Sequence, residues 1–146
     1  MKTRPLILFL FAFFAISGVS SCEKETVLPE SDWPAEIKTY IETHFSDLAI
    51  LQVVKDKDGT KTTYEVRLEG GFVLEFNRKM EVIEIEGLDR LPDSVIPAKI
   101  LDYINQNFPA NYIIEWELEG KNQEVKLDNK LEIQFDMSGE FLRIDG

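Results

Sequence analysis

Cysteine and histidine are almost absent from this chain of 146 residues, which contains one of each. Cys22 therefore has no partner for an intrachain disulfide. A nucleophilic hydrolase needs a serine, cysteine or threonine beside a base, which is usually a histidine. The lone His44 aligns with an asparagine in the second half of the chain, so we interpret it as structural. We predict a protein that is not an enzyme, with no catalytic residues and no cofactor.

Basic residues are scarce as well. The chain has 16 Lys and Arg against 27 Asp and Glu, and two of the basic residues, Lys2 and Arg4, lie in a segment that we expect to be removed. From Cys22 onward the net charge is near −13. Such a surface repels phosphate backbones, so we expect no nucleic-acid partner.

Long apolar segments are missing apart from one run at the N-terminus, from Leu6 to Ile16. This run follows a short basic start and precedes small residues, which is the layout of a secretory signal peptide. A transmembrane anchor is the alternative, but these 11 residues are too few to span roughly 30 Å of hydrocarbon. We therefore predict a signal peptide over residues 1–21 and an exported protein.

The signal segment ends at Val19-Ser20-Ser21-Cys22, which resembles the lipobox of bacterial lipoproteins. In a lipobox the cysteine becomes the first residue and carries the lipid. An ordinary secreted protein with an incidental cysteine is the alternative. We expect lipid attachment at Cys22, a tether over residues 22–32, and a membrane-anchored lipoprotein of the bacterial envelope that faces the periplasm or the cell surface.

The rest of the chain is an internal duplication. Residues 34–45 recur at 97–108 with a constant offset of 63, and six of the twelve positions are identical. The match resumes at an offset of 59, where residues 64–68 pair with 123–127, so the second copy is four residues shorter in one loop. We predict two repeats, over residues 33–90 and 91–146, that share one sheet.

Each copy has the same pattern of elements. Apolar residues spaced by three and four predict a helix after Pro34 and another after Pro97. Alternating segments separated by turn residues then predict four strands in each copy. The predicted fold class is α+β, with two tandem repeats that each pack one helix on a four-stranded antiparallel meander.

One face of each meander is expected to remain open, because a single helix covers only the other face. Phe141 is predicted to point away from the core, since Leu142 and Ile144 on the same strand are predicted inward. An exposed aromatic residue among acids is a candidate anchor for a partner. The predicted binding face consists of outward residues from both copies: Ile50, Val54, Val73, Glu75, Val82, Ile113, Glu115, Glu117, Glu132, Phe141 and Arg143.

The order of these motifs resembles the PepSY-like, beta-lactamase-inhibitor-like family. In the second copy the resemblance is carried by Leu91-Pro92, Tyr103-Ile104, Phe108-Pro109, Glu124-Val125-Lys126-Leu127, Phe135-Asp136 and Gly139, and in the first by residues 64–68, Gly71 and Phe76. The first copy departs from the pattern at Asn77 and Met80, where Asp and Gly are expected. The resemblance implies two repeats whose sheets join into one concave surface, on an exported bacterial protein, and the family name implies inhibition of an enzyme.

Three functions follow from these observations. The first is a non-catalytic binding or inhibitory module of the cell envelope, which acts on an unidentified protein or peptide through the open face. A face that is merely solvated is the plain alternative. The second function, weak binding of a divalent cation, arises because carboxylates on neighbouring strands can trap calcium, although we assign no individual metal ligand. The third is a hydrolase, against which the missing nucleophile and base argue.

Overall fold

A computed structural model describes residues 24–145. These described residues form one sheet and two α-helices, so the predicted α+β class is confirmed. No helix in this part of the chain is both long and apolar enough to cross a membrane. The elements are β1 (Thr26–Val27), α1 (Ala35–His44), β2 (Ile50–Asp58), β3 (Lys61–Leu68), β4 (Val73–Asn77), β5 (Val82–Glu86), α2 (Ala98–Asn107), β6 (Ile113–Glu119), β7 (Asn122–Leu127), β8 (Glu132–Asp136) and β9 (Phe141–Asp145), with 3₁₀ turns η1 (Glu30–Asp32), η2 (Glu69–Gly71) and η3 (Asp93–Val95).

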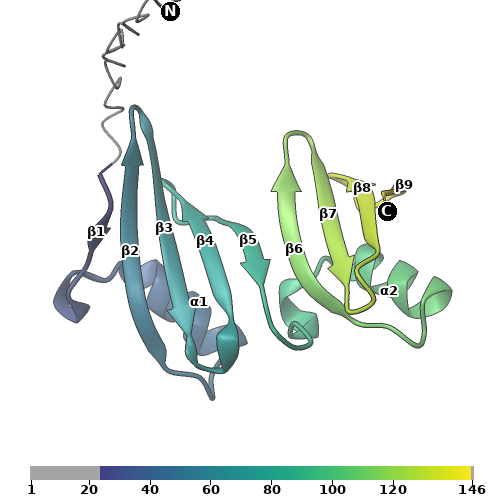
Figure 1. Cartoon of the computed structure of the whole chain (residues 1–146), viewed down its shortest axis with the longest axis horizontal. Coiled ribbons are helices and arrows are strands. Elements are labelled where there is room, and N and C mark those ends of the chain that lie inside the picture. Colours follow the sequence, from purple (N-terminus) through teal and green to yellow (C-terminus); the bar gives the residue numbers. More distant parts are fainter. Residues whose placement is uncertain (1–23, 146) are drawn as a thin grey trace, which may run out of the picture.

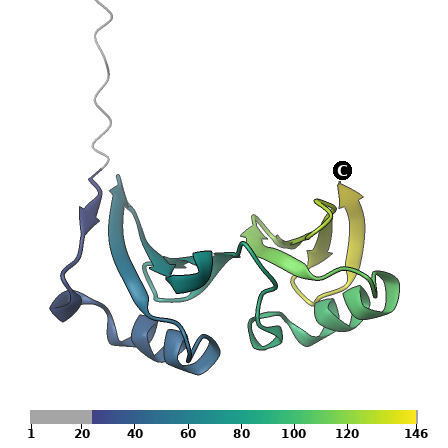
Figure 2. The same ribbon diagram turned by 60° about the horizontal axis from the view of Figure 1, so that its bottom comes forward.

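The nine strands pair antiparallel in the order in which they occur along the chain (Figure 1). The sheet is continuous between the two copies, because β5 pairs with β6 in the register Glu84 opposite Glu117 and Ile85 opposite Trp116. Both helices lie on the same side of the strands (Figure 2). No helix formed by residues 24–145 therefore lies on the other side of the sheet.

The core lies between the helices and the sheet. Ile37 of α1 and Ile100 of α2, at equivalent positions, are fully buried. Each helix also places a tyrosine edge-on against a buried phenylalanine, with ring centroids 5.4 Å apart for Tyr40 and Phe76 and 5.3 Å apart for Tyr103 and Phe135. The two halves thus build the same helix-to-sheet packing from equivalent residues.

The segment predicted as a tether is partly folded. Thr26 pairs with Lys55 at the outer edge of β2. The 3₁₀ turn η1 follows, and it lies 63 residues before η3, the offset that also relates the two helices. The predicted tether of residues 22–32 therefore contributes a strand and a turn to the fold.

Two predicted face residues lie on the helix side because the first long strand of each copy contains a β-bulge. Ile50 is opposite the buried Leu68, and Ile113 is opposite the buried Leu127. The register then shifts by one residue in both strands, which a bulge does by inserting an unpaired residue. Ile113 is 4 % exposed, so the prediction that Ile50 and Ile113 face outward is wrong.

Two more predictions fail at the last strand of each copy. Val82 is opposite the buried Phe76 and Phe141 is opposite the buried Phe135, and a register shift accompanies each pair. Phe141 stacks on Tyr103 of α2, with ring centroids 5.0 Å apart and planes 8° apart. The prediction that Val82 and Phe141 point outward is therefore wrong, because strict alternation does not hold across a bulge.

Candidate functional site

A row of five glutamates crosses the helix-free face of the sheet. Glu65 is opposite Glu75, Glu75 is opposite Glu84, Glu84 is opposite Glu117, and Glu117 is opposite Glu124. The row runs over five consecutive strands, from β3 to β7, and passes the junction between the two copies. We call these five residues the glutamate row.

Such a row is unfavourable for the stability of the fold. Like charges directly opposite each other on neighbouring strands are destabilising, by amounts comparable to the roughly 0.2–1 kcal/mol that a good cross-strand pair contributes. The unfavourable pairing occurs four times in succession here. Because charges across an interface are complementary, a stripe of negative charge could meet a cation or a cationic partner.

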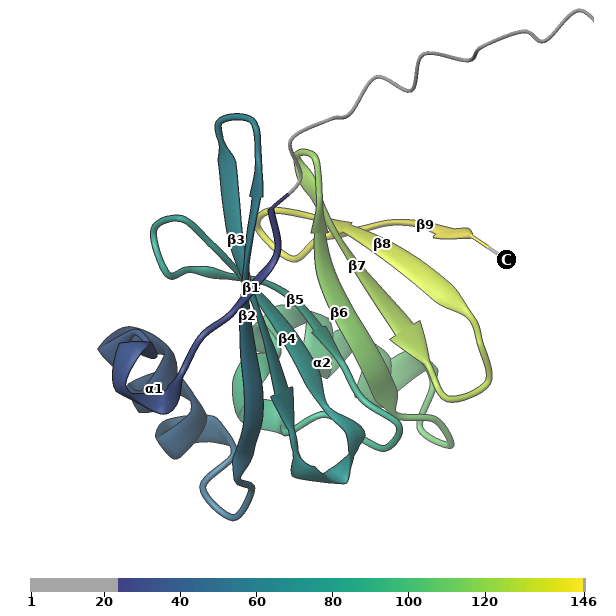
Figure 3. The same ribbon diagram turned by 60° about the vertical axis from the view of Figure 1, so that its left-hand side comes forward.

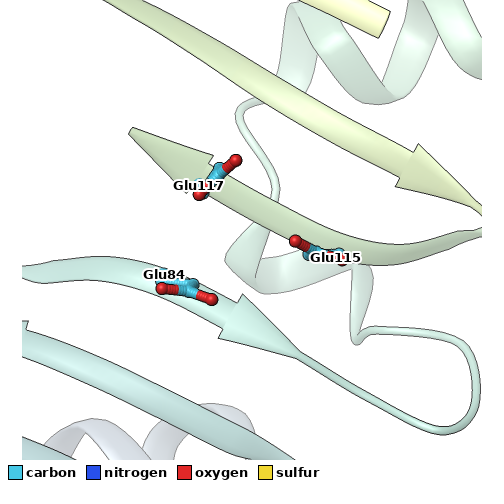
Figure 4. A group of neighbouring side chains, drawn as sticks. All are labelled: Glu84, Glu115 and Glu117. Atoms are coloured by element: carbon cyan, nitrogen blue, oxygen red, sulfur yellow. The ribbon is translucent and has the colours of Figure 1, made fainter. Parts of the chain in front are cut away.

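The acidic groups are most concentrated at the junction of β5 and β6. Carboxylate oxygens of Glu84, Glu115 and Glu117 all lie within 4.8 Å of one another (Figure 4). All three side chains are half-buried. Three carboxylates at this separation could supply oxygen ligands to one divalent cation.

The electrostatics of this junction favour the protonated form of the Glu84 and Glu117 carboxyl groups. Burial raises the pKa of Glu84 above its ordinary value, and the charges of Glu117, Glu75 and Glu115 raise it further. Burial also raises the pKa of Glu117, as do the neighbouring charges of Glu115 and Glu124. A cation bound at the junction would relieve this repulsion and would compete with protons.

Neighbouring side chains compensate the charge unevenly. Lys126 Nζ lies 2.7 Å from a Glu132 carboxylate oxygen and 3.4 Å from one of Glu115. The amide of Gln134 donates to Glu124 at 3.0 Å. Within residues 24–145, Glu75, Glu84 and Glu117 have no basic nitrogen within 4.0 Å. The centre of the glutamate row is thus its least neutralised part.

The row ends beside a hollow at the β2–β3 hairpin. This hairpin extends past the rest of the sheet (Figure 3). The hollow has a volume of about 340 Å³ and includes Glu65 and Glu75 of the row. Asp56 also lines it, and the Oδ1 atom of this residue is buried without a hydrogen-bond partner among the described residues. The open face is therefore both acidic and recessed at this end.

The structure separates the predicted binding face into two groups. Ile50, Val82, Ile113 and Phe141 lie on the helix side, as described above. Residues whose cross-strand partners place them on the helix-free side are Val54, Val73, Glu75, Glu115, Glu117, Glu132 and Arg143. Their role in binding remains a prediction.

Sequence reasoning missed three members of the row as site residues: Glu65, Glu84 and Glu124. Alternation along each strand already indicated that such residues face outward. That signal cannot tell which residues of different strands meet, because cross-strand register depends on turns and on the pairing of distant segments. Glu84, at the centre of the junction, was thus the hardest to recognise.

His44 has a partner that the sequence did not indicate. Its Nδ1 atom lies 2.9 Å from the hydroxyl oxygen of Ser94, which belongs to η3 at the start of the second copy. Its ring also lies against Tyr40, with centroids 4.5 Å apart. No carboxylate in the described part of the chain is hydrogen-bonded to His44, so the third group that would orient a catalytic base is not seen there. The contact joins α1 to the second copy.

The fold and the face together define a class of protein: an α+β module with one open antiparallel sheet whose uncovered face is acidic. Two matches of one family model, over residues 19–84 and 63–143, carry the identification further. The chain belongs to the family described as "Putative beta-lactamase-inhibitor-like, PepSY-like". No curated protein matches the chain significantly.

Solved structures from Bacteroides are similar over most of the chain. A "putative calcium-regulated periplasmic protein" from Bacteroides thetaiotaomicron is 28% identical with a TM-score of 0.78, over 84% of this chain and 97% of that one. A putative periplasmic protein of the DUF2874 family from Bacteroides vulgatus is 29% identical, with a TM-score of 0.77 over 84% of this chain and 97% of that one. A further B. vulgatus periplasmic protein of unknown function is 31% identical, with a TM-score of 0.78 over 84% and 100%. These neighbours support an exported protein of the envelope.

Cys22 lies outside the described residues, so its expected lipid attachment remains a prediction.

Proposed function

We propose that this protein is a non-catalytic module of the bacterial envelope that binds a cationic segment of another protein through the helix-free face of its sheet. The glutamate row carries the proposal. Five carboxylates on five adjacent strands form a stripe of one charge, and the three central ones lack a basic neighbour among the described residues. A lysine- or arginine-rich segment laid across the strands would neutralise these charges.

The architecture supports this function. We infer that the chain consists of two tandem copies of one helix-and-meander unit, whose sheets join at β5 and β6. The helices occupy one side, so the whole length of the other side is available to a partner. The family description supports an inhibitor-like mode, in which the partner is an enzyme that this face covers.

A capture experiment tests the proposal. The full chain, immobilised in detergent, is incubated with envelope extract and compared with the variant Glu75→Gln/Glu84→Gln/Glu117→Gln. The control variant Glu36→Gln/Glu42→Gln/Asp102→Asn removes the same charge from exposed positions on the two helices. We expect a basic protein that the parent and the control retain and the row variant loses. Equal retention by all three proteins would contradict the proposal.

Lipid attachment at Cys22 would hold the module at a membrane. Several acyl chains anchor a protein stably, whereas one binds only marginally. We expect Cys22→Ser to abolish incorporation of labelled lipid and to release the protein from the membrane fraction. Equal labelling of the variant and the parent would contradict the lipoprotein assignment.

A second function, binding of a divalent cation, is favoured by one specific arrangement. The carboxylates of Glu84, Glu115 and Glu117 converge within 4.8 Å at the junction of the copies. One structural neighbour is described as calcium-regulated, although that property belongs to the neighbour. We infer a weak calcium site in the millimolar range that is typical of extracellular modules, where Kd is about 10⁻⁴–10⁻³ M.

Calorimetric titration with calcium tests this second function. We expect calcium to bind the full chain at neutral pH and more weakly at pH 5, because protons compete for carboxylates whose pKa is raised. Glu84→Gln should remove binding, while Glu132→Gln, which lies beside Lys126 outside the trio, should retain it. Absence of heat at about 5 mM calcium would eliminate the site.

A further inference from the structure

β9 is an edge strand with exposed apolar side chains. Within the described residues it pairs only with β8 (Figure 3). Leu142 and Ile144 are 46% and 47% exposed. The opposite edge of the sheet is different, because β1 covers part of β2 there. An unprotected edge strand is a template for pairing with another strand.

The first copy contains the same strand in a paired state. β5 corresponds to β9 at the offset of 59, so that Ile85 corresponds to Ile144 and Glu84 to Arg143. Ile85 and Ile144 occupy the same position against their inner neighbours, opposite Leu74 and Ile133. The outer side of β5 is occupied by β6. A strand of this repeat is therefore built to accept a neighbour where β9 has none among the described residues.

The backbone groups available on β9 follow from this equivalence. The Gly87 amide donates to the Ile114 carbonyl at 2.8 Å, so the alternate residues Gly87 and Ile85 direct their backbone groups toward β6. By the equivalence, Ile144 directs its N–H and C=O away from β8. An incoming antiparallel strand would form its paired hydrogen bonds there.

The side chains of β9 are complementary to a second β9. When two copies pair antiparallel about a two-fold axis at Ile144, each Ile144 faces the other and each Arg143 faces an Asp145. Arg143 and Asp145 already attract each other within one strand, at 2.7 Å between Nε and Oδ2. The outermost strand thus carries opposite charges on either side of one isoleucine, which a two-fold axis brings into register.

We propose that the protein self-associates through β9, with a second copy of this chain as the partner. The two strands pair antiparallel about Ile144 and extend the sheet across both molecules. A two-fold axis of this kind is perpendicular to the sheet, so all helices of the dimer lie on one side and both glutamate rows lie on the other. The proposal is independent of what the row binds.

Exchanging the charges of Arg143 and Asp145 tests the proposed register between the two β9 strands. The full chain, purified from membranes in mild detergent, is examined by analytical ultracentrifugation beside the variants Arg143→Asp, Asp145→Arg and the double exchange. Each single variant places like charges opposite each other twice in the dimer, so we expect the dimer dissociation constant to rise about tenfold. The double exchange should restore association. Arg67→Asp is the control, because Arg67 forms a similar ion pair with Glu65 on the inner strand β3, with 2.6 Å between Nε and Oε1. This variant should leave association unchanged.

Disulfide trapping provides the second readout. Ile144→Cys should form a covalent dimer on oxidation, because opposed residues of a hydrogen-bonded pair lie about 5.5 Å apart at Cα, within the range of a disulfide. Two controls should form no covalent dimer. One is Met137→Cys, at an exposed residue of the nearby turn, and the other is the parent, which retains Cys22. A monomer at all concentrations up to about 1 mM would overturn the proposal. A dimer that the single exchanges do not weaken, or that the Ile144→Cys substitution does not trap, would also overturn it.

Discussion

At the scale of single residues, Glu84 lies in unfavourable surroundings on the open face. It is opposite Glu75 on one side and Glu117 on the other. Its pKa is raised first by burial and then by these charges. A group of this kind adds stability only while it is protonated, and that contribution is lost as the pH rises through the folded pKa.

Glu84→Gln should therefore stabilise the protein at pH 7. We expect a gain of about 0.5–1 kcal/mol in the free energy of unfolding at pH 7, because two repulsive cross-strand pairs disappear. The gain should vanish below about pH 4, where the parent carboxyl is also neutral. Urea unfolding at both pH values measures this. Glu132→Gln loses an ion pair with Lys126 and should not stabilise the protein. A pH-independent effect of Glu84→Gln would contradict the electrostatic interpretation.

Phe141 presents the opposite case, a residue that alternation predicts outward and that packing turns inward. It stacks on Tyr103 and lies edge-on to Phe135 at 6.4 Å, yet remains 41% exposed. We expect Phe141→Ala to lower the free energy of unfolding by about 1–3 kcal/mol, below the loss from a fully buried phenylalanine. Leu88→Ala, at a side chain that is 85% exposed, is the control. A Phe141→Ala variant as stable as this control would contradict the packing role.

At the scale of elements, one side-chain oxygen organises the turn before the last strand of each copy. In the second copy, Asp136 Oδ1 accepts hydrogen bonds from the amides of Ser138 and Glu140. In the first copy, Asn77 Oδ1 accepts from the amides of Lys79 and Glu81. The Asn77 and Met80 departures from the family pattern therefore leave the turn intact.

Gly139 is a position of this turn where an added side chain would meet α2. Its φ is +83°, and a Cβ added there would lie 2.9 Å from the Cβ of Lys99. We expect Gly139→Ala to lower the free energy of unfolding by about 1–3 kcal/mol, since strain in φ adds to the clash with α2. Gly59→Ala isolates the φ effect, because Gly59 has φ +56° and open space around it. If the two substitutions lower the free energy of unfolding equally, the contact with α2 contributes nothing to the cost of Gly139→Ala.

At the scale of the whole molecule, the two copies should unfold as one unit. The pairing of β5 with β6 joins their sheets, and the bond between His44 and Ser94 joins α1 to the second copy. Neither half can separate without exposing a strand edge at the junction.

The two tryptophans make this testable, because Trp33 lies in the first copy and Trp116 in the second. In Trp33→Phe and Trp116→Phe, fluorescence reports on one half at a time, while circular dichroism reports on the whole chain. We expect each variant to give the same urea midpoint by both probes, as a two-state transition requires. Trp116→Phe loses a buried hydrogen bond to Gln123, so the two midpoints are compared within each variant and not between variants. Fluorescence and circular dichroism midpoints that differ within one variant would indicate independent halves.

The sequence by itself showed the recurring motifs of its two halves, and it predicted the succession of helices and strands after residue 33 and the outward direction of residues such as Glu75 and Glu117. These features are local, because helices and strands have periods that can be recognised within a single segment. Only the tertiary structure decided that five glutamates align across five strands, and that Ile50, Val82, Ile113 and Phe141 turn toward the helices. The reason is that register and bulges arise where distant segments pair, and a shift of one residue moves a side chain to the other face of the sheet.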